Sequence, residues 1–297
     1  MKGKIVYNGG LWAKNFAPLK YQVDNLTENF RELGAEIEMV SSEDLSVMTD
    51  GERVDANLGE ADFVVFLDKD HLRAKLLEKA GYKLFNRSEV IRICDDKALS
   101  YEALSGKVPI VPTLFPPLSY FGENSRNAFS KATEVFGFPM IVKTRKGSLG
   151  EGVFKAESER DYEKIIKASE GREIIFQKFY GKPGEDLRVI VVGGNAVCAM
   201  KRVNEYDFRA NIERGGKGYN TDLTAEMKNL AEEAARTVGA DYCGVDILFG
   251  DEGLKICEIN SNAFFGGVYK ATGVDVGHKF AEYIFERISL EKGKTKP

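Results

Sequence analysis

The sequence is poor in the residues that most often carry catalysis or covalent cross-links. Its 297 residues include only two histidines and four cysteines. His71 and His278 lie far apart in the chain, so we expect neither a histidine-based triad nor a histidine zinc site. The cysteines are scattered without a CxxC pair, which favours buried free thiols over disulfides or zinc. Any chemistry must therefore rest on carboxylates, lysines, arginines and the backbone.

Long apolar runs and a strong excess of one charge are also lacking. The 42 basic and 46 acidic residues leave a net charge of −4, so the sequence lacks the excess of positive charge that is typical of nucleic-acid-binding proteins. No apolar stretch is long enough to span a membrane, and the N-terminus enters a strand without the features of a signal peptide. We therefore expect a cytoplasmic protein that binds neither nucleic acid nor membranes.

The first part of the chain alternates strands and helices. Strands are expected at 4–8, 35–40, 61–67 and 82–85, with helices at 18–33 and 71–80. This alternation predicts a small doubly wound parallel sheet, whose ligands bind at the carboxyl ends of the strands. Trp12 and Lys14 follow the first strand and could face a substrate there. Packing of Trp12 under the next helix is the slightly favoured alternative.

The rest of the chain mixes strands and helices less regularly. Ser88 is expected to cap a helix over 89–104. Further helices are expected at 126–136, 161–168, 224–239 and 277–290. Strands are expected at 138–143, from 153 onward, and at 173–179. Two more, 187–192 and 196–203, are expected to pair as a hairpin.

The segments 244–249 and 254–260 flank a turn and predict a second hairpin. If a three-residue loop closes it with Gly253 at positive φ, Asp246 faces Glu258, and Asn260 lies further along the same face. Two facing carboxylates repel unless a positive group lies between them, and Mg²⁺ prefers carboxylate and amide oxygens. The alternative is an acidic face that is simply solvated, and the hairpin alone does not decide between them.

A glycine-rich loop follows the strand that ends at Lys143. It holds Gly147, Gly150 and Gly152, but it lacks the spacing of a P-loop and lies between two strands. This geometry is typical of a flap whose N–H groups fold over phosphates, and Lys143 would add a point charge. A plain flexible hairpin is the alternative.

Three arginines follow in the C-terminal half, Arg188, Arg202 and Arg209. Guanidinium groups close together suit an anionic substrate and a transferring phosphoryl group. Ordinary surface charge is the alternative, and it is our interpretation of Lys201 and Arg214.

The order of these parts along the chain is more specific than any one of them. The set begins with a helical Lys97, Lys143 with its glycine loop, and the hinge at 176–180. It continues with 185–188, 209–211 and the Asp246 hairpin. This ordered set resembles the ATP-grasp superfamily, most closely its RimK-like branch of amino-acid ligases, over essentially the whole chain. The resemblance implies two α+β subdomains gripping ATP, preceded by a small doubly wound parallel domain. The implied domains are 1–89, a lid or central subdomain at 90–178, and a C-terminal subdomain with the metal site at 179–297.

The resemblance also implies roles for single residues. The phosphate and flap contacts would be Lys97, Lys143, Gly147, Ser148, Gly150 and Gly152. The adenine, ribose and remaining nucleotide contacts would be Gln177, Lys178, Phe179, Glu185, Asp186 and Asn211. The ligands of Mg²⁺ or Mn²⁺, with two ions expected, would be Asp246, Glu258 and Asn260. The groups stabilising phosphoryl transfer and an acyl phosphate would be Arg188, Arg202 and Arg209.

The activity implied is an ADP-forming carboxylate–amine ligase that acts on an amino acid or peptide through an acyl phosphate. Alternatives are a small-molecule kinase on the same fold and a non-catalytic nucleotide-binding protein. A dimer or tetramer is expected by resemblance alone. The family often has Glu where Lys178 stands, and often has proline in the segment occupied here by 261–267. The identity of the amine substrate therefore does not follow from the resemblance. Whether Trp12, Phe264 and Phe265 contact substrate is left open.

Overall fold

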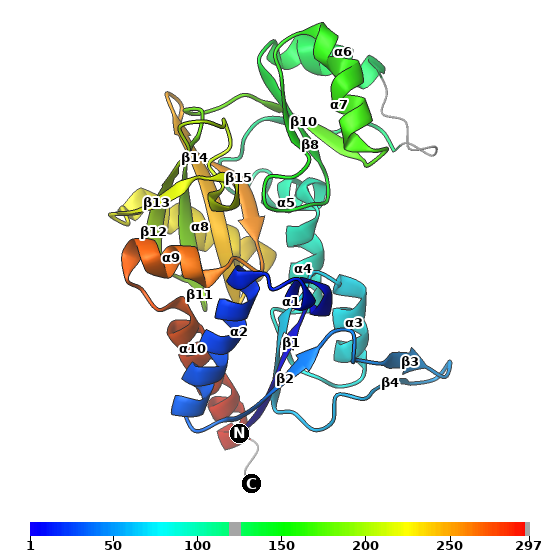
Figure 1. The fold of residues 1–297 in the computed structure, drawn as a ribbon, viewed down its shortest axis with the longest axis vertical. Helices are drawn as coiled ribbons and strands as arrows, with labels where there is room; N and C mark the ends of the chain where they lie inside the picture. Colours follow the sequence, from blue (N-terminus) through cyan, green and yellow to red (C-terminus); the bar gives the residue numbers. More distant parts are fainter. Residues whose placement is uncertain (119–125, 295–297) are drawn as a thin grey trace.

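The computed structural model describes residues 1–118 and 126–294 (Figure 1). Within these ranges the strands form two four-stranded sheets, one five-stranded sheet and one two-stranded hairpin. The N-terminal sheet is parallel, whereas the central and C-terminal sheets are antiparallel. The predicted mixed α/β class with a parallel N-terminal sheet is confirmed.

The N-terminal sheet has the strand order β2-β1-β5-β6. Its strands are β1 (Lys2–Tyr7), β2 (Glu36–Ser41), β5 (Phe63–Leu67) and β6 (Leu84–Phe85). Strand β5 is buried along its whole length, as expected for a parallel strand covered on both faces. Helix α2 (Ala17–Glu32) packs on one face and α3 (His71–Lys79) on the other. A short hairpin of β3 (Val47–Thr49) and β4 (Val54–Ala56) was not predicted, because segments this short show no periodicity.

The first turn after β1 is helical rather than a loop. Asn8 caps α1 (Gly9–Ala13) by accepting a hydrogen bond from Leu11 N at 2.9 Å. Trp12 stacks against Tyr7 with ring centroids 4.6 Å apart. It joins the neighbouring core, so the favoured packing interpretation of Trp12 agrees with the structure.

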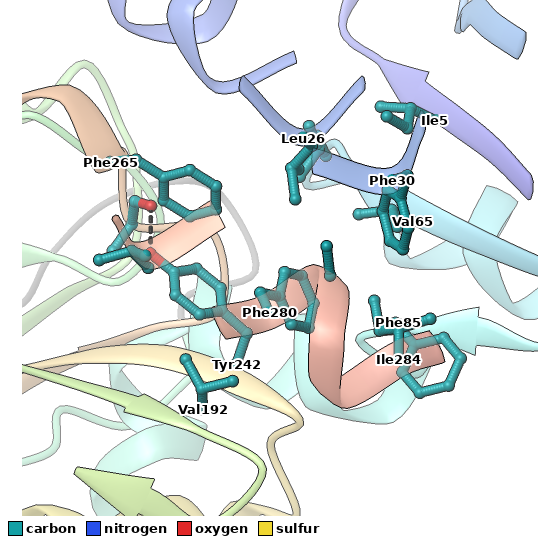
Figure 2. Packing of buried hydrophobic residues seen from close by; sticks show 14 of the residues in the cluster. Ile5, Leu26, Phe30, Val65, Phe85, Val192, Tyr242, Phe265, Phe280 and Ile284 are labelled. Atoms are coloured by element: carbon teal, nitrogen blue, oxygen red, sulfur yellow. Dashed lines mark hydrogen bonds between the residues drawn. The ribbon is translucent and has the colours of Figure 1, made fainter. Parts of the chain in front are cut away.

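The end of the chain packs against its beginning. Figure 1 shows α10 (Val276–Lys294) beside α2, and α9 (Phe265–Thr272) lies next to both. Figure 2 shows the shared core, in which Leu26 and Phe30 of α2 face Phe280 and Ile284 of α10. Helix α10 passes the predicted end at residue 290, and residues 295–297 lie outside the described ranges. The N- and C-terminal units thus share one core, and the boundaries at 89 and 178 stay predictions.

The central sheet has the order β7-β10-β8-β9. Its strands are β7 (Thr113–Leu114), β8 (Met140–Thr144), β9 (Val153–Ala156) and β10 (Ile174–Lys178). Helices α6 (Arg126–Phe136) and α7 (Tyr162–Ser169) cover one face. Phe129 lies at the centre of this packing and contacts Phe176 edge to face, with centroids 5.9 Å apart.

The C-terminal sheet has the order β13-β12-β11-β14-β15. Its strands are β11 (Glu185–Val192), β12 (Asn195–Val203), β13 (Lys217–Thr221), β14 (Tyr242–Gly250) and β15 (Gly253–Asn260). Helix α8 (Ala225–Val238) covers one face; Thr224 caps its start and Gly239, in the left-handed region, ends it. Both β13 and α9 were missed, because β13 is a largely exposed edge strand and α9 contains two adjacent glycines.

The predicted helix over 89–104 is wrong as a single element. It divides into α4 (Ser88–Asp95) and α5 (Lys97–Leu104), because Asp96 is extended and its carboxylate accepts from Ala98 N at 2.9 Å. Asp96 therefore acts as a cap inside the segment. Ser88 does not cap α4; its hydroxyl donates to Glu78 at 2.6 Å instead. The break places Lys97 in the first turn of α5.

Asn86 ties the N-terminal sheet to the C-terminal unit. Its side chain is 3% exposed and donates to the carbonyls of Tyr242 (2.6 Å) and Ser261 (2.9 Å). Its carbonyl oxygen accepts from the N–H groups of Asp241 (2.7 Å) and Tyr242 (3.1 Å). One amide thus satisfies four buried backbone groups from two separate segments.

We expect Asn86→Ala to lower the free energy of unfolding by about 2–4 kcal/mol, because it leaves several buried backbone groups unpaired. Urea denaturation monitored by circular dichroism measures the change. Asn127→Ala, on an exposed position of α6, is the control and should change stability by less than about 0.5 kcal/mol. Equal effects of the two substitutions would contradict the bridging role of Asn86.

Candidate active site

A cavity lies between the central and C-terminal sheets, and its empty space, open solvent included, is about 830 Å³. We call it the first cavity. Its walls come from β8 and β10 on one side and from β11, β12, β14 and β15 on the other. The predicted site residues all line it except Arg188, Gly152 and Asn260. Arg188 and Asn260 line an adjoining second cavity of about 970 Å³.

Two buried lysines meet at one end of the first cavity. Lys97 Nζ donates to the carbonyl of Gly147 at 2.9 Å and lies 3.6 Å from a carboxylate oxygen of Glu258. Lys143 Nζ lies 3.4 Å from Cys257 Sγ. Burial lowers the pKa of Lys143, but the surrounding Cys257, Tyr101 and Glu258 outweigh it and raise the pKa above its ordinary value. Lys143 is therefore a fixed positive charge in the cavity wall.

The glycine loop forms a flap that is hydrogen-bonded across the first cavity. Arg209 Nη1 donates to the carbonyls of Gly150 (3.0 Å) and Val153 (3.2 Å), and Arg214 Nε donates to that of Leu149 (3.1 Å). Our interpretation of Arg214 as plain surface charge is therefore wrong, since it helps to hold the flap. Lys201, which we also interpreted as surface charge, forms an ion pair with Glu185 at 2.7 Å.

Two flap positions require glycine. Gly150 has φ of +71°, and a Cβ there would lie 2.8 Å from Arg214 Nε. Gly152 has φ of +67°, and a Cβ there would lie 2.1 Å from Thr144 Oγ1. Both the left-handed backbone and the close approach exclude a side chain. Gly152 thus shapes the flap without lining the cavity.

Four buried charges form a chain across three adjacent strands. Arg188 donates to both carboxylate oxygens of Asp246 at 2.7 and 2.8 Å. Arg202 donates to both oxygens of Asp186 at 2.7 and 2.6 Å and lies 2.9 Å from Asp246 Oδ2. The sheet register places Asp186 opposite Arg202 and Arg188 opposite Asp246. We call these four residues the charge quartet.

The charge quartet holds Asp246 ionised. Burial would raise the pKa of Asp246, but Arg188 and Arg202 lower it to about 2. Burial raises the pKa of Asp186 despite the contact with Arg202. A carboxylate offers about four acceptor sites, and the two arginines occupy three of those on Asp246. One site on Asp246 Oδ1 is left for another ligand.

The hairpin of β14 and β15 brings the predicted metal ligands to one place. Asp246 lies opposite Glu258 and Gly244 opposite Asn260, as predicted. The loop itself has two residues instead of three, since Gly250 pairs with Gly253, and a register shift beside Asp246 restores the expected pairing. Gly253 has the expected positive φ, +90°.

The predicted metal ligands suit a hard cation only with help from solvent or substrate. Among residues 1–118 and 126–294, no three His, Cys, Asp or Glu side chains cluster to hold a metal. The two carboxylates of Asp246 and Glu258 and the amide oxygen of Asn260 remain, and these are the oxygen ligands that Mg²⁺ prefers. Mg²⁺ commonly takes one or two carboxylates and completes its shell with water and phosphate oxygens. The residues present therefore fit Mg²⁺.

The far end of the first cavity is lined by the strand end that we predicted to contact adenine. Gln177 is 1% exposed and donates to Thr113 Oγ1 at 2.8 Å. The Lys178 ammonium pairs with Glu252 at the hairpin tip, 2.8 Å away. This pairing draws the side chain of Lys178 toward Glu252, while Phe179 continues the wall.

Residues 94–284, well over half of the chain, match the family model described as the RimK-like ATP-grasp domain. The chain belongs to the RimK-like ATP-grasp family. A probable alpha-L-glutamate ligase of Marinomonas sp. is 32% identical over 94% of this chain and 96% of that protein. Human N-acetylaspartylglutamate synthase A is 32% identical over 73% of this chain and 56% of that protein.

Solved structures show the same fold. A RimK domain ATP-grasp protein from Sphaerobacter thermophilus has a TM-score of 0.73 at 18% identity, covering 96% of this chain and 100% of that one. A D-alanine–D-alanine ligase from Bacillus anthracis, complexed with ATP, has a TM-score of 0.71 at 15% identity, covering 100% of both chains. The predicted ATP-grasp fold is confirmed.

These findings also confirm the predicted class of enzyme. This RimK-like chain is an ATP-dependent ligase that joins a carboxylate to an amine. Enzymes of this kind use ATP and Mg²⁺, and the ATP-grasp ligase PsnB has been solved with Mg and ADP. In the described part of the chain, no helix combines the length and apolarity that crossing a membrane requires.

The second cavity adjoins the first, sharing Ser148, Asn211 and Glu258 with it. Sequence analysis missed several polar residues of its wall, among them Asn8 and Asp68, which directly follow β1 and β5. Their position was the available signal, because parallel sheets bind ligands at the carboxyl ends of their strands. Phe264 lines the second cavity, whereas Phe265 is buried 5.3 Å from the Tyr242 ring. Trp12 and Lys14 line neither cavity.

We expect Asp246→Asn to destabilise the nucleotide-free protein by about 3–5 kcal/mol, because it leaves two buried guanidinium groups short of a counter-charge. The folded-state pKa of Asp246 is depressed, so its contribution is present above its ordinary pKa near 4 and is lost as the pH falls toward 2. Urea denaturation between pH 7 and 3 should show a constant deficit down to about pH 4.5 and a shrinking one below.

Asp251→Asn, at the exposed tip of the same hairpin, is the matched control and should leave stability within about 0.5 kcal/mol of the original. A deficit below about 1 kcal/mol for Asp246→Asn at pH 7 would contradict the charge quartet as a buried, mutually compensating set.

Proposed function

We propose that this chain forms an amide or peptide bond between a carboxylate and the amine of an amino acid or peptide, through an acyl phosphate. The observation that carries the proposal is Arg202 Nη1, a buried guanidinium nitrogen without a partner in a residue that lines the first cavity. A buried donor is costly unless a ligand satisfies it, and a phosphoryl group is the anion that this wall suits.

The surroundings of Arg202 support a phosphate site. Lys97 and Lys143 would hold the phosphates of ATP, with the flap over 147–152 above them. The strand end at 177–179 would contact adenine, and Glu185 or Asp186 the ribose, beside Asn211. Asp246, Glu258 and Asn260 would hold two Mg²⁺ ions, which would neutralise charge on the phosphates.

The chemistry needs positioning and charge neutralisation more than covalent help from the protein. An oxygen of the substrate carboxylate attacks the γ-phosphorus of ATP, and ADP leaves with the electrons of the broken bond. The amine nitrogen then attacks the acyl carbon, phosphate leaves, and the nitrogen gives up a proton. Arg188, Arg202 and Arg209 would stabilise the negative charge that moves in both steps.

The substrates are proposed by class. Relatives are named for ligation of glutamate and for synthesis of N-acetylaspartylglutamate, which supports an amino-acid or peptide substrate here. The PsnB structures with a precursor peptide support a peptide equally. A cytoplasmic location, the lack of a nucleic-acid partner, and a dimer or tetramer stay predictions.

Phosphate release in MgATP with pooled amino acids, single carboxylates and small peptides tests the proposal, with mass spectrometry of the products. We expect release to require both a carboxylate and an amine, with a product lighter than the sum of its substrates by one water. Hydroxylamine in place of the amine should trap an acyl hydroxamate. A phosphorylated product formed without an amine would instead indicate a kinase. MgATP binding without any turnover would indicate a binding protein.

Glu258→Ala should reduce ADP formation by about 10³-fold or more, because it removes a major electrostatic group of the phosphoryl-transfer site. A coupled ADP assay with the substrates identified above measures the loss. Asp251→Ala, on the exposed tip of the same hairpin, should keep near-normal turnover. Near-normal turnover by Glu258→Ala would contradict the proposed metal site.

A further inference from the structure

The second cavity has one apolar wall. It is built from α1, α2, the end of β5 and the segment before α9, and its apolar side chains are those of Leu11, Phe16, Leu19, Leu67 and Phe264. Phe16 and Phe264 meet edge to face, with centroids 5.4 Å apart. These apolar side chains suit this wall to an apolar group of a ligand.

The cationic residues of the second cavity are already engaged. Among the described residues that line it, only Lys69 and Arg188 carry a positive charge. Lys69 Nζ lies 2.8 Å from Asp95, and Arg188 is bidentate to Asp246 in the charge quartet. Neither cationic side chain is therefore free to pair with a carboxylate that a substrate side chain would bring into the cavity.

Asp68, unlike these two cations, accepts hydrogen bonds from neutral donors. Its oxygens accept from two neutral donors, Asn8 Nδ2 at 3.0 Å and the backbone N–H of Lys69 at 2.7 Å. No ion pair to Asp68 is present among the described residues. Asp68 is half-buried at the carboxyl end of β5, and Asn8 fixes its orientation. It is thus a positioned carboxylate in the cavity wall whose charge is not paired with a cation among the described residues.

We propose that the second cavity binds the amine substrate, with its ammonium group on Asp68 and an apolar side chain against the Phe16–Phe264 wall. This inference rests on the proposed function and names the acceptor as an apolar amino acid, or a peptide beginning with one. It sets the chain apart from the relatives named as glutamate ligases. A glutamate side chain would place a carboxylate in a cavity that already holds Asp68, Glu213 and Glu258.

Two amines with blocked α-carboxylates test this directly: L-leucinamide has no carboxylate and can bind only as an acceptor, and L-glutamic acid α-amide adds the side-chain carboxylate whose effect is tested. L-leucinamide and L-glutamic acid α-amide would be titrated into the full chain by calorimetry with MgADP present. We expect L-leucinamide to bind at least about tenfold more tightly, because the cavity leaves the glutamate carboxylate unpaired.

Variants separate the two parts of the inference. Asp68→Asn should weaken L-leucinamide binding about tenfold or more and leave MgADP binding unchanged. Asp55→Asn, an exposed residue of β4, is the matched control and should change neither. Phe264→Lys should shift the preference toward L-glutamic acid α-amide, because it supplies the missing positive charge.

The outcomes are distinct. If MgADP binds but L-glutamic acid α-amide binds as well as L-leucinamide, or neither amide binds, the acceptor assignment is overturned and the ligase proposal stands. Unchanged L-leucinamide binding by Asp68→Asn overturns the ammonium site. If the unsubstituted chain does not bind MgADP, the proposed function fails and the acceptor assignment fails with it.

Discussion

The active site depends on one physical constraint, which is that charges buried in the C-terminal sheet must cancel one another. Asp186, Arg188, Arg202 and Asp246 satisfy it across three neighbouring strands, and each pair sits directly opposite in the sheet register. A shift of one residue would turn these side chains to the opposite face of the sheet. Two hydrogen-bonding groups of the charge quartet are left without a partner inside it: one guanidinium nitrogen of Arg202 and one acceptor site on Asp246. On the proposed function, those two groups are what the charge quartet itself would add to the binding of a phosphate and a cation.

The C-terminal and N-terminal sheets supply different kinds of residue to the two cavities. The antiparallel C-terminal sheet supplies fixed charges from the middle of its strands. The parallel N-terminal sheet supplies Asn8 and Asp68 from strand ends, where loops change most readily without cost to the core. Glu258 lies in the wall of both cavities and links them. On the proposed assignments, the ammonium site at Asp68 would lie on the N-terminal sheet and the phosphate site on the central and C-terminal sheets.

Local patterns predicted local geometry well and distant pairing poorly. The opposition of Asp246 and Glu258 was correct although the turn was wrong, because a register shift beside Asp246 offset the shorter loop. Proximity of the arginines was predicted, but the pairing of Arg188 with Asp246 was not. It joins strands 58 residues apart, and periodicity within a strand does not identify its neighbour. The helix break at Asp96 was missed because capping and helix-surface aspartates look alike in sequence.

The packing of α2 against α10 has a consequence for synthesis on the ribosome. Asn25 of α2 hydrogen-bonds to Asp275, which lies 250 residues later, just before α10. Until α10 has been made, the apolar stripe of α2 around Leu26 and Phe30 has only part of its cover. Contacts so distant in sequence form slowly, and exposed apolar surface invites association in the meantime. The core around α2 is thus completed only after α10, which lies far later in the chain, has been translated.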